Sequence, residues 1–64
     1  MKLDREKVEL ARARKQMSIP AIAEAYGVSR ARMNIILNQR EITPICAGRL
    51  AKALECDVTD IIED

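Results

Sequence analysis

Residues 18 to 37 constrain the fold more than any other part of the chain, because they carry the signals for two short helices joined by a tight turn. Ser18 can accept a hydrogen bond from a free N–H group at the start of one helix, and Ser29 can do the same for the next. Gly27 can adopt the left-handed conformation that ends the first helix. The stretch therefore predicts a helix-turn-helix, a unit that presents the N-terminal residues of its second helix at the surface.

Cap residues at three other positions predict further helices. These helices are expected over about Asp4–Lys15, Thr43–Leu54 and Asp57–Ile62. Pro20 and Pro44 fit the first turns of their helices, because the N–H that proline lacks would be unpaired there. Alternation of apolar and polar residues with period two is almost absent, so no sheet is expected. The sequence predicts one all-α domain over residues 1–64, a compact five-helix fold.

The core is expected to be aliphatic, because the chain has one tyrosine and no phenylalanine or tryptophan. Apolar residues at helical spacing predict its main members: Val8, Ile22, Tyr26, Val28, Met33, Ile36, Leu50, Ala51, Leu54 and Ile61. The apolar residues without an evident place in this core are Leu10, Ile35, Ile42, Ile45 and Ile62. A small protein gains from covering such side chains, so we expect a homodimer. A monomer is the alternative, because scattered exposed apolar residues are common.

Composition argues against several kinds of site. A structural zinc site normally takes four protein ligands, whereas this chain has Cys46, Cys56 and no histidine. We expect two reduced, largely buried thiols, with a disulfide as the alternative, and no metal, cofactor or small-molecule ligand. The N-terminal residues are charged where a signal peptide would be apolar, and no apolar run approaches the roughly 20 residues that span a bilayer. We therefore expect a cytoplasmic protein without membrane contact.

Charge is unevenly distributed, although the formal net charge is only +1. Most basic residues lie in the central part of the chain: Arg12, Arg14, Lys15, Arg30, Arg32 and Arg40, with Arg49 nearby. Residues 55 to 64 contain five acids and no base. One side of a small domain is therefore expected to be net positive, as a DNA-binding face requires, although an ordinary solvated surface can show the same pattern.

The second helix of the predicted unit has two distinct faces at about 100° per residue. Met33, Ile36 and Leu37 fall on one face and are expected to point inward. The other face holds Ala31, Asn34, Ile35 and Asn38, with Arg30 and Arg32 at its flanks. Arginine can bind guanine or phosphate, asparagine can bind adenine, and apolar side chains can meet thymine methyl groups. The apolar Ile35 on this polar face indicates contact with DNA or with another protein.

Several sequence elements occur in an order that is typical of one family. They are Arg12, Ser18, Ile22-Ala23, Gly27-Val28-Ser29, Met33 with Ile36, Leu50-Ala51-Lys52-Ala53-Leu54 and the ending from Asp57 to Ile62. From about Val8 to Ile62, they resemble the Cro and lambda-repressor-like helix-turn-helix regulators, also called the XRE family. The resemblance implies a lambda-repressor-like five-helix domain that binds double-stranded DNA with its third helix in the major groove.

The resemblance also implies roles for individual residues. The positions that match the family's base contacts are Arg30, Ala31 and, one turn later, Ile35. Ser29 and Arg40 match positions that commonly contact phosphate. Arg12 matches a position that is usually structural and often paired with an acid, so we exclude it from the DNA site. With the outer helix face included, the candidate DNA site consists of Ser29, Arg30, Ala31, Arg32, Asn34, Ile35, Asn38 and Arg40.

The chain departs from the family pattern at two places. Family members often have a phosphate-binding glutamine directly after the first cap, where this chain has Ile19 and then Pro20. The usual glycine after the third helix is missing, and the following loop is about one residue shorter than is typical. We therefore expect Asn38 or Gln39 to take the left-handed conformation. Small family members commonly pair around helices four and five, which agrees with the expected homodimer.

The leading functional interpretation is a sequence-specific DNA-binding transcriptional regulator. It is most simply a repressor that occupies an operator, since 64 residues leave no room for a ligand-sensing domain. The alternative is a protein-interaction module of the same fold, antitoxin-like or an adaptor, whose Ile35 face binds another protein. An enzyme is not expected, because the chain has no histidine, its cysteines have no base partner and its two glycines form no phosphate-binding loop.

Overall fold

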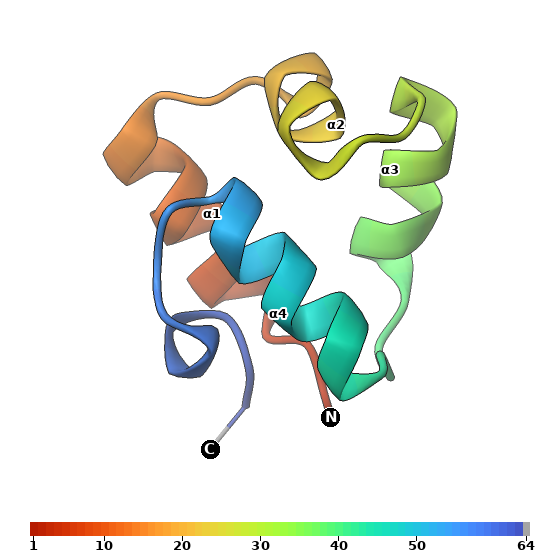
Figure 1. Cartoon of the computed structure of the whole chain (residues 1–64). Helices are drawn as coiled ribbons and strands as arrows, with labels where there is room; N and C mark the ends of the chain where they lie inside the picture. The colour runs from red at the N-terminus through yellow and green to blue at the C-terminus, as the bar shows by residue number, and fades with distance from the viewer. Residues whose placement is uncertain (64) are drawn as a thin grey trace.

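Four α-helices and one 3₁₀ helix form the regular structure of residues 1–63, the part of the chain that the computed structural model describes (Figure 1). They are α1 Arg5–Lys15, α2 Ile19–Tyr26, α3 Arg30–Asn38, α4 Pro44–Ala53 and η1 Val58–Asp60. No strand occurs in these residues, so the predicted all-α fold is confirmed. The fifth predicted helix is only a 3₁₀ turn. It ends at Asp60 rather than Ile62, because residues 61–63 pair with the start of the chain.

Every helix begins where the sequence predicted a cap. The side chains that accept hydrogen bonds from the N–H groups of the first turns are Asp4, Ser18, Ser29, Thr43 and Asp57. Asp60 in turn accepts a hydrogen bond from the N–H of Asp57, which gives η1 a reciprocal capping box. Each such cap contributes about 1 kcal/mol to a helix that is too short to be stable alone.

One core contains side chains from all four α-helices. Its buried members are Leu3, Val8, Ala11, Ile22, Ala23, Tyr26, Met33, Ile36, Ile42, Ala47, Leu50, Ala51, Ala53, Leu54 and Ile61. All the predicted core residues belong to this set except Val28, which is half-buried against it. Of the apolar residues expected outside the core, the exposed ones are Leu10, Ile35 and Ile45, and Ile62 is half-buried. Ile42 is only 6% exposed, so its expected place outside the core is wrong.

Residues Met1–Asp4, which we call the N-terminal strap, pair with the loop that follows α3. The N–H of Leu3 donates to the carbonyl oxygen of Arg40 at 2.8 Å, and the N–H of Ile42 donates to the carbonyl oxygen of Met1 at 2.9 Å. The side chain of Leu3 is 3% exposed and anchors the strap in the core. This pairing explains the burial of Ile42, because it holds the loop extended against the body of the protein.

The other edge of the strap pairs with the C-terminal segment. The N–H of Asp4 donates to the carbonyl oxygen of Ile61, and the N–H of Glu63 donates to the carbonyl oxygen of Lys2, both at 2.9 Å. The two ends of the described chain therefore lie side by side, with the N-terminal residues between the loop and the C-terminal segment (Figure 1).

The loop after α3 contains no left-handed residue, so the expectation of one at Asn38 or Gln39 is wrong. Asn38 ends α3, and Gln39 is extended, with φ −76° and ψ 134°. The strap makes a left-handed turn unnecessary, because it supplies the hydrogen-bond partners that the loop backbone needs. The non-glycine residues with positive φ in the described chain are Gln16, after α1, and Glu55, after α4.

Both cysteines are free thiols, as expected, but they are half-buried rather than largely buried. Each lies near one end of α4, at the edge of the core: Cys46 in its first turn and Cys56 just beyond its end. Residues 1–63 contain no group of three or more side chains that could hold a metal ion. None of their helices is long and apolar enough to cross a membrane.

Candidate nucleic-acid interface

A tight turn between α2 and α3 fixes the point at which α3 begins. Gly27 has φ 96°, the left-handed conformation predicted for it. The N–H groups of Gly27 and Val28 both donate to the carbonyl oxygen of Ala23, at 2.8 and 3.0 Å. Ser29 then caps α3 by accepting a hydrogen bond from the N–H of Arg32 at 3.1 Å. The predicted helix-turn-helix is therefore present, with α2 packed against α3 (Figure 1).

The two faces of α3 are as predicted. Met33 and Ile36 are buried, and Leu37 is half-buried against the core. The cap and the exposed side of the helix carry the remaining predicted site residues: Ser29, Arg30, Ala31, Arg32, Asn34, Ile35 and Asn38. Ile35 is 52% exposed in the middle of this face. The helix thus offers guanidinium, amide and small apolar groups together on one accessible surface.

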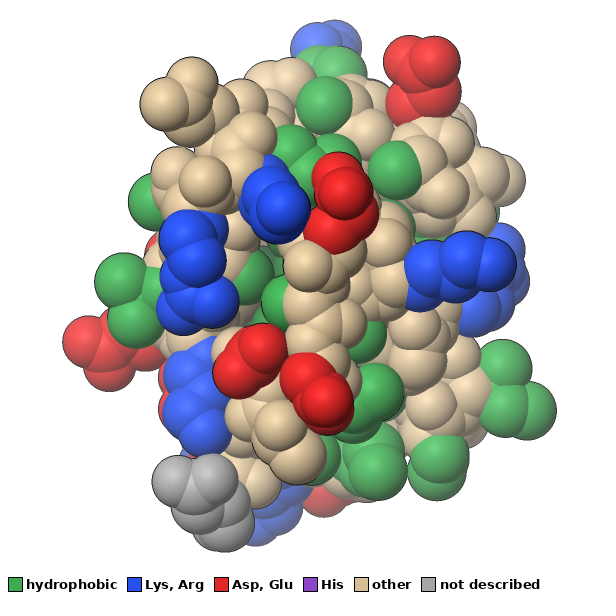
Figure 2. Space-filling model, turned by 60° about the vertical axis from the view of Figure 1, so that its left-hand side comes forward, with side chains coloured by type: hydrophobic (Ala, Val, Ile, Leu, Met, Phe, Trp, Pro, Cys, Tyr) green, Lys and Arg blue, Asp and Glu red, His purple; other side chains and the backbone are tan. Residues whose placement is uncertain are grey.

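Charge on α3 differs from charge on the opposite side of the molecule. Figure 2 turns the side away from α3 toward the viewer, and acidic and basic side chains are mixed there. By contrast, α3 contains two arginines and no acid. A polyanion therefore meets less repulsion along α3 than on the side shown in Figure 2.

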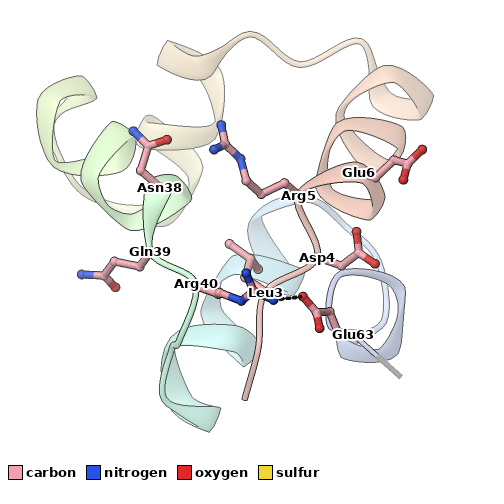
Figure 3. A pocket seen from close by; sticks show the side chains of 8 residues that line it. All are labelled: Leu3, Asp4, Arg5, Glu6, Asn38, Gln39, Arg40 and Glu63. Atoms are coloured by element: carbon pink, nitrogen blue, oxygen red, sulfur yellow. Dashed lines mark ion pairs between the residues drawn. The ribbon is translucent and has the colours of Figure 1, made fainter.

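Arg40 lies in the loop beyond α3, at a hollow of about 430 Å³ (Figure 3). The hollow is lined by the N-terminal strap, the first residues of α1, the end of α3 at Asn38, and Glu63. The Nη2 atom of Arg40 lies 3.9 Å from the Oε2 atom of Glu63. Arg40 is thus close to the end of α3 but is paired with an acid, a pairing that sequence reasoning did not predict.

The side chains of Arg12 and Ile19 make contacts within the protein. The Nη1 atom of Arg12 lies 2.9 Å from a carboxylate oxygen of Glu9, and its Nε donates to the carbonyl oxygen of Met17 at 3.3 Å. The pairing with an acid expected for Arg12 is therefore present. Ile19 is half-buried against the core. It cannot take the phosphate-binding role of the glutamine that the family often has at this position.

Arg49, on α4, braces the end of α2 in a way that the sequence did not indicate. Its Nη2 donates to the carbonyl oxygen of Tyr26 at 3.0 Å, and its guanidinium lies over the tyrosine ring. The hydroxyl of Tyr26 donates to the Sγ atom of Cys46 at 3.3 Å. Burial is the main reason that the pKa of Tyr26 is raised, the contact with Cys46 adds to it, and Arg49 opposes it. These contacts join distant segments, so no local sequence signal reveals them.

The fold and the exposed face of α3 define a helix-turn-helix DNA-binding domain. A family model described as the Cro/C1-type HTH DNA-binding domain matches residues 8–64, and the chain belongs to this family. The searches of curated proteins and of solved structures gave no match. The match leaves out residues 1–7, which contain the whole N-terminal strap and the first residues of α1.

Proposed function

We propose that this protein is a sequence-specific transcriptional regulator of the cytoplasm, a repressor that acts by occupying an operator with α3 in the major groove. The observation that carries the proposal is the division of α3 into two faces. Met33 and Ile36 fix the helix in the core, while its exposed side presents groups that can bind base edges. Membership of the Cro/C1-type family supports DNA as the partner.

Within this proposal, the site residues have two kinds of role. Arg30, Ala31 and Ile35 face base edges, because they lie along the exposed side of α3 from its first turn onward. Ser29 and Arg40 contact phosphates on either side of the helix. The remaining members of the site, which flank or extend this surface, are Arg32, Asn34 and Asn38.

Selection of bound duplexes from a random DNA pool tests sequence specificity directly. The purified protein at moderate salt is expected to enrich one motif, and a palindromic motif would also give the half-site spacing. Retention without any enriched motif, lost as salt rises, would mean that binding is only electrostatic. That result would contradict sequence-specific regulation.

Arg30→Ala tests the leading base contact. We expect a loss of about 1 to 3 kcal/mol in binding free energy and a relaxed preference at one base pair, if Arg30 binds guanine. An equal loss on all sequences, with a shallower salt dependence, would assign Arg30 to phosphate instead. Arg14→Ala is the control, because Arg14 is an exposed arginine on α1. Unchanged affinity after Arg30→Ala would remove this residue from the site.

Two copies are proposed to bind one operator. Ile45 is 78% exposed on the first turn of α4, where it is available to a second copy. Twofold symmetry would place the two α3 helices about one DNA turn, roughly 34 Å, apart on a palindromic site. Sedimentation velocity is expected to show a dimer that Ile45→Asp weakens, with Leu10→Asp on α1 as the control. A wild-type monomer at all concentrations would contradict this arrangement.

The exposed Ile35 favours a second candidate function, a protein-interaction module of the same fold, antitoxin-like or an adaptor. If Ile35 contacts a partner protein, Ile35→Asp should abolish that complex while non-specific DNA affinity falls only partly. If Ile35 contacts thymine methyl groups, the same substitution should instead remove the preference for the selected DNA motif.

A further inference from the structure

The hollow at the end of α3 has a basic residue that no part of the proposed site includes. Arg5 is the first residue of α1 and lies outside the family match. Its side chain is exposed and lines the same hollow as Asn38 and Arg40. Figure 3 shows the Arg5 side chain extending from α1 toward α3, while Glu6 points the other way. Arg5 therefore adds a second guanidinium at the edge of the candidate interface.

Of the three acids that line the hollow, Asp4 and Glu63 are occupied by other contacts, and the side chain of Glu6 points away from Arg5. The carboxylate of Asp4 accepts a hydrogen bond from the N–H of Lys7 at 3.1 Å and so caps α1. Glu63 is paired with Arg40. Within residues 1–63, Arg5 has no ion pair and no side-chain hydrogen bond. Its guanidinium is consequently available to an anion from outside the protein.

The strap fixes the spacing between the two arginines. Leu3 lies two residues before Arg5, and its N–H donates to the carbonyl oxygen of Arg40 at 2.8 Å. The N–H of Asp4 is bonded to the carbonyl oxygen of Ile61, so the backbone on the N-terminal side of Arg5 is held as well. Two cations on a fixed backbone lose less conformational entropy on binding than two cations on separate mobile loops.

We propose that Arg5 is a further DNA contact, which binds a backbone phosphate beside the one bound by Arg40. The proposal rests on the proposed function, since it takes the exposed face of α3 as the DNA-binding surface. Guanidinium groups form charge-assisted hydrogen bonds with phosphate oxygens, and the hollow leaves space for such a group between the strap and α3. A phosphate at Arg40 replaces its 3.9 Å pair with Glu63.

The test is the salt dependence of affinity for two duplexes, the selected motif and a random sequence. Arg5→Gln removes the charge, and Arg5→Lys keeps it. Arg14→Gln is the matched control, because nine residues at about 100° each place Arg14 on the opposite side of α1. Both arginines are exposed, so the variants are expected to fold, which circular dichroism checks.

Loss of one phosphate contact lowers the slope of log affinity against log salt by about 0.9. Between 50 and 200 mM salt, Arg5→Gln is therefore expected to lose about 3.5-fold less affinity than the wild type does. The effect should be equal on both duplexes, because a phosphate contact is indifferent to sequence. Arg5→Lys and Arg14→Gln should keep the wild-type slope, and Arg5→Gln with Arg40→Gln should lower it by about 1.8.

Three results would overturn the role of Arg5: an unchanged slope in Arg5→Gln, an equal change in Arg14→Gln, or a loss confined to the selected motif. If the wild type binds neither duplex, the proposed function fails and the Arg5 contact fails with it. If no motif is selected but Arg5→Gln still lowers the slope on random DNA, sequence specificity fails while the phosphate contact stands.

Discussion

The guanidinium of Arg49 lies over the ring of Tyr26, with 4.2 Å between its Cζ atom and the ring centroid, and also donates to the carbonyl oxygen of that tyrosine. Carbonyl groups at the end of a helix have no partner within the helix, so a side chain from another element can bind them. Through this contact, α4 holds the end of α2 directly before the turn that leads into α3. A residue that is distant in sequence therefore supports the turn from which α3 begins.

Arg49→Met should lower the free energy of unfolding by about 1 to 3 kcal/mol, because it removes a charge-assisted hydrogen bond and a cation–π contact. Lys52→Met is the matched control, since Lys52 is exposed on the same helix, and it should change stability by less than about 0.5 kcal/mol. Urea denaturation of the three proteins measures both effects. Equal stability of the two variants would show that the contact contributes nothing measurable.

The two glycines should respond oppositely to substitution by alanine. Gly27→Ala is expected to lower the free energy of unfolding by about 1 to 2 kcal/mol, because φ at this position is 96°. Space is available for the added Cβ, since the nearest atom, on Arg49, is 3.9 Å away. Gly48 lies inside α4, and a Cβ there would meet nothing within 4 Å. Gly48→Ala should therefore stabilise the protein by about 0.5 to 1 kcal/mol. Thermal denaturation distinguishes the two, and a destabilising Gly48→Ala would contradict this account.

Stability should fall at alkaline pH partly because of Cys56. Burial raises the pKa of the Cys56 thiol above its ordinary value of 9.0, and the charge of Asp60 raises it further. The folded state thus holds the thiol proton more tightly than the unfolded chain does. This contribution is complete below pH 9.0 and is lost as pH rises through the raised pKa. Unfolding free energies measured from pH 8 to 10 should fall less steeply in Cys56→Ala, whereas an unchanged slope would exclude Cys56.

Glu63→Gln should tighten DNA binding. It removes the carboxylate that lies 3.9 Å from the guanidinium of Arg40 and that repels incoming phosphate. The gain is expected to be about two- to fivefold at low salt, the range of an exposed ion pair, and to shrink as salt rises. Glu55→Gln, in the turn after α4, is the control for loss of one negative charge. An equal gain in both variants would mean that net charge alone is responsible.

Local signals were sufficient to predict the helices and most of the core. Ser18, Ser29 and Thr43 act as caps in the structure, and Gly27 is left-handed, as predicted. These features could be predicted because each signal depends only on neighbouring residues. The inward face of α3 followed from the helical period. The predicted DNA site lies around one exposed helix face, but its contacts with DNA remain a prediction.

Long-range pairing could not be predicted from the sequence. Residues 1–4 alternate apolar and polar side chains, but four residues are too few to predict a strand, and nothing in them indicates that they pair with the loop after α3 and with the C-terminal segment. That pairing buried Ile42 and removed the need for a left-handed Gln39, so both expectations were wrong for the same reason. Arg5 gave no signal either, because it stands between acids at the start of a helix and becomes notable only beside Arg40.

Lys2 and Glu63 are far apart in the sequence but are paired in the structure. Their backbones are joined by a 2.9 Å hydrogen bond, so a short peptide could connect the two segments without moving either. A circularly permuted chain, cut after Gln16 and thus beginning just before α2 and ending with α1, would keep every helix packed against its present neighbours. The arrangement of the helices in space therefore does not depend on their order along the polypeptide. The new ends would lie between α1 and α2 rather than beside the strap.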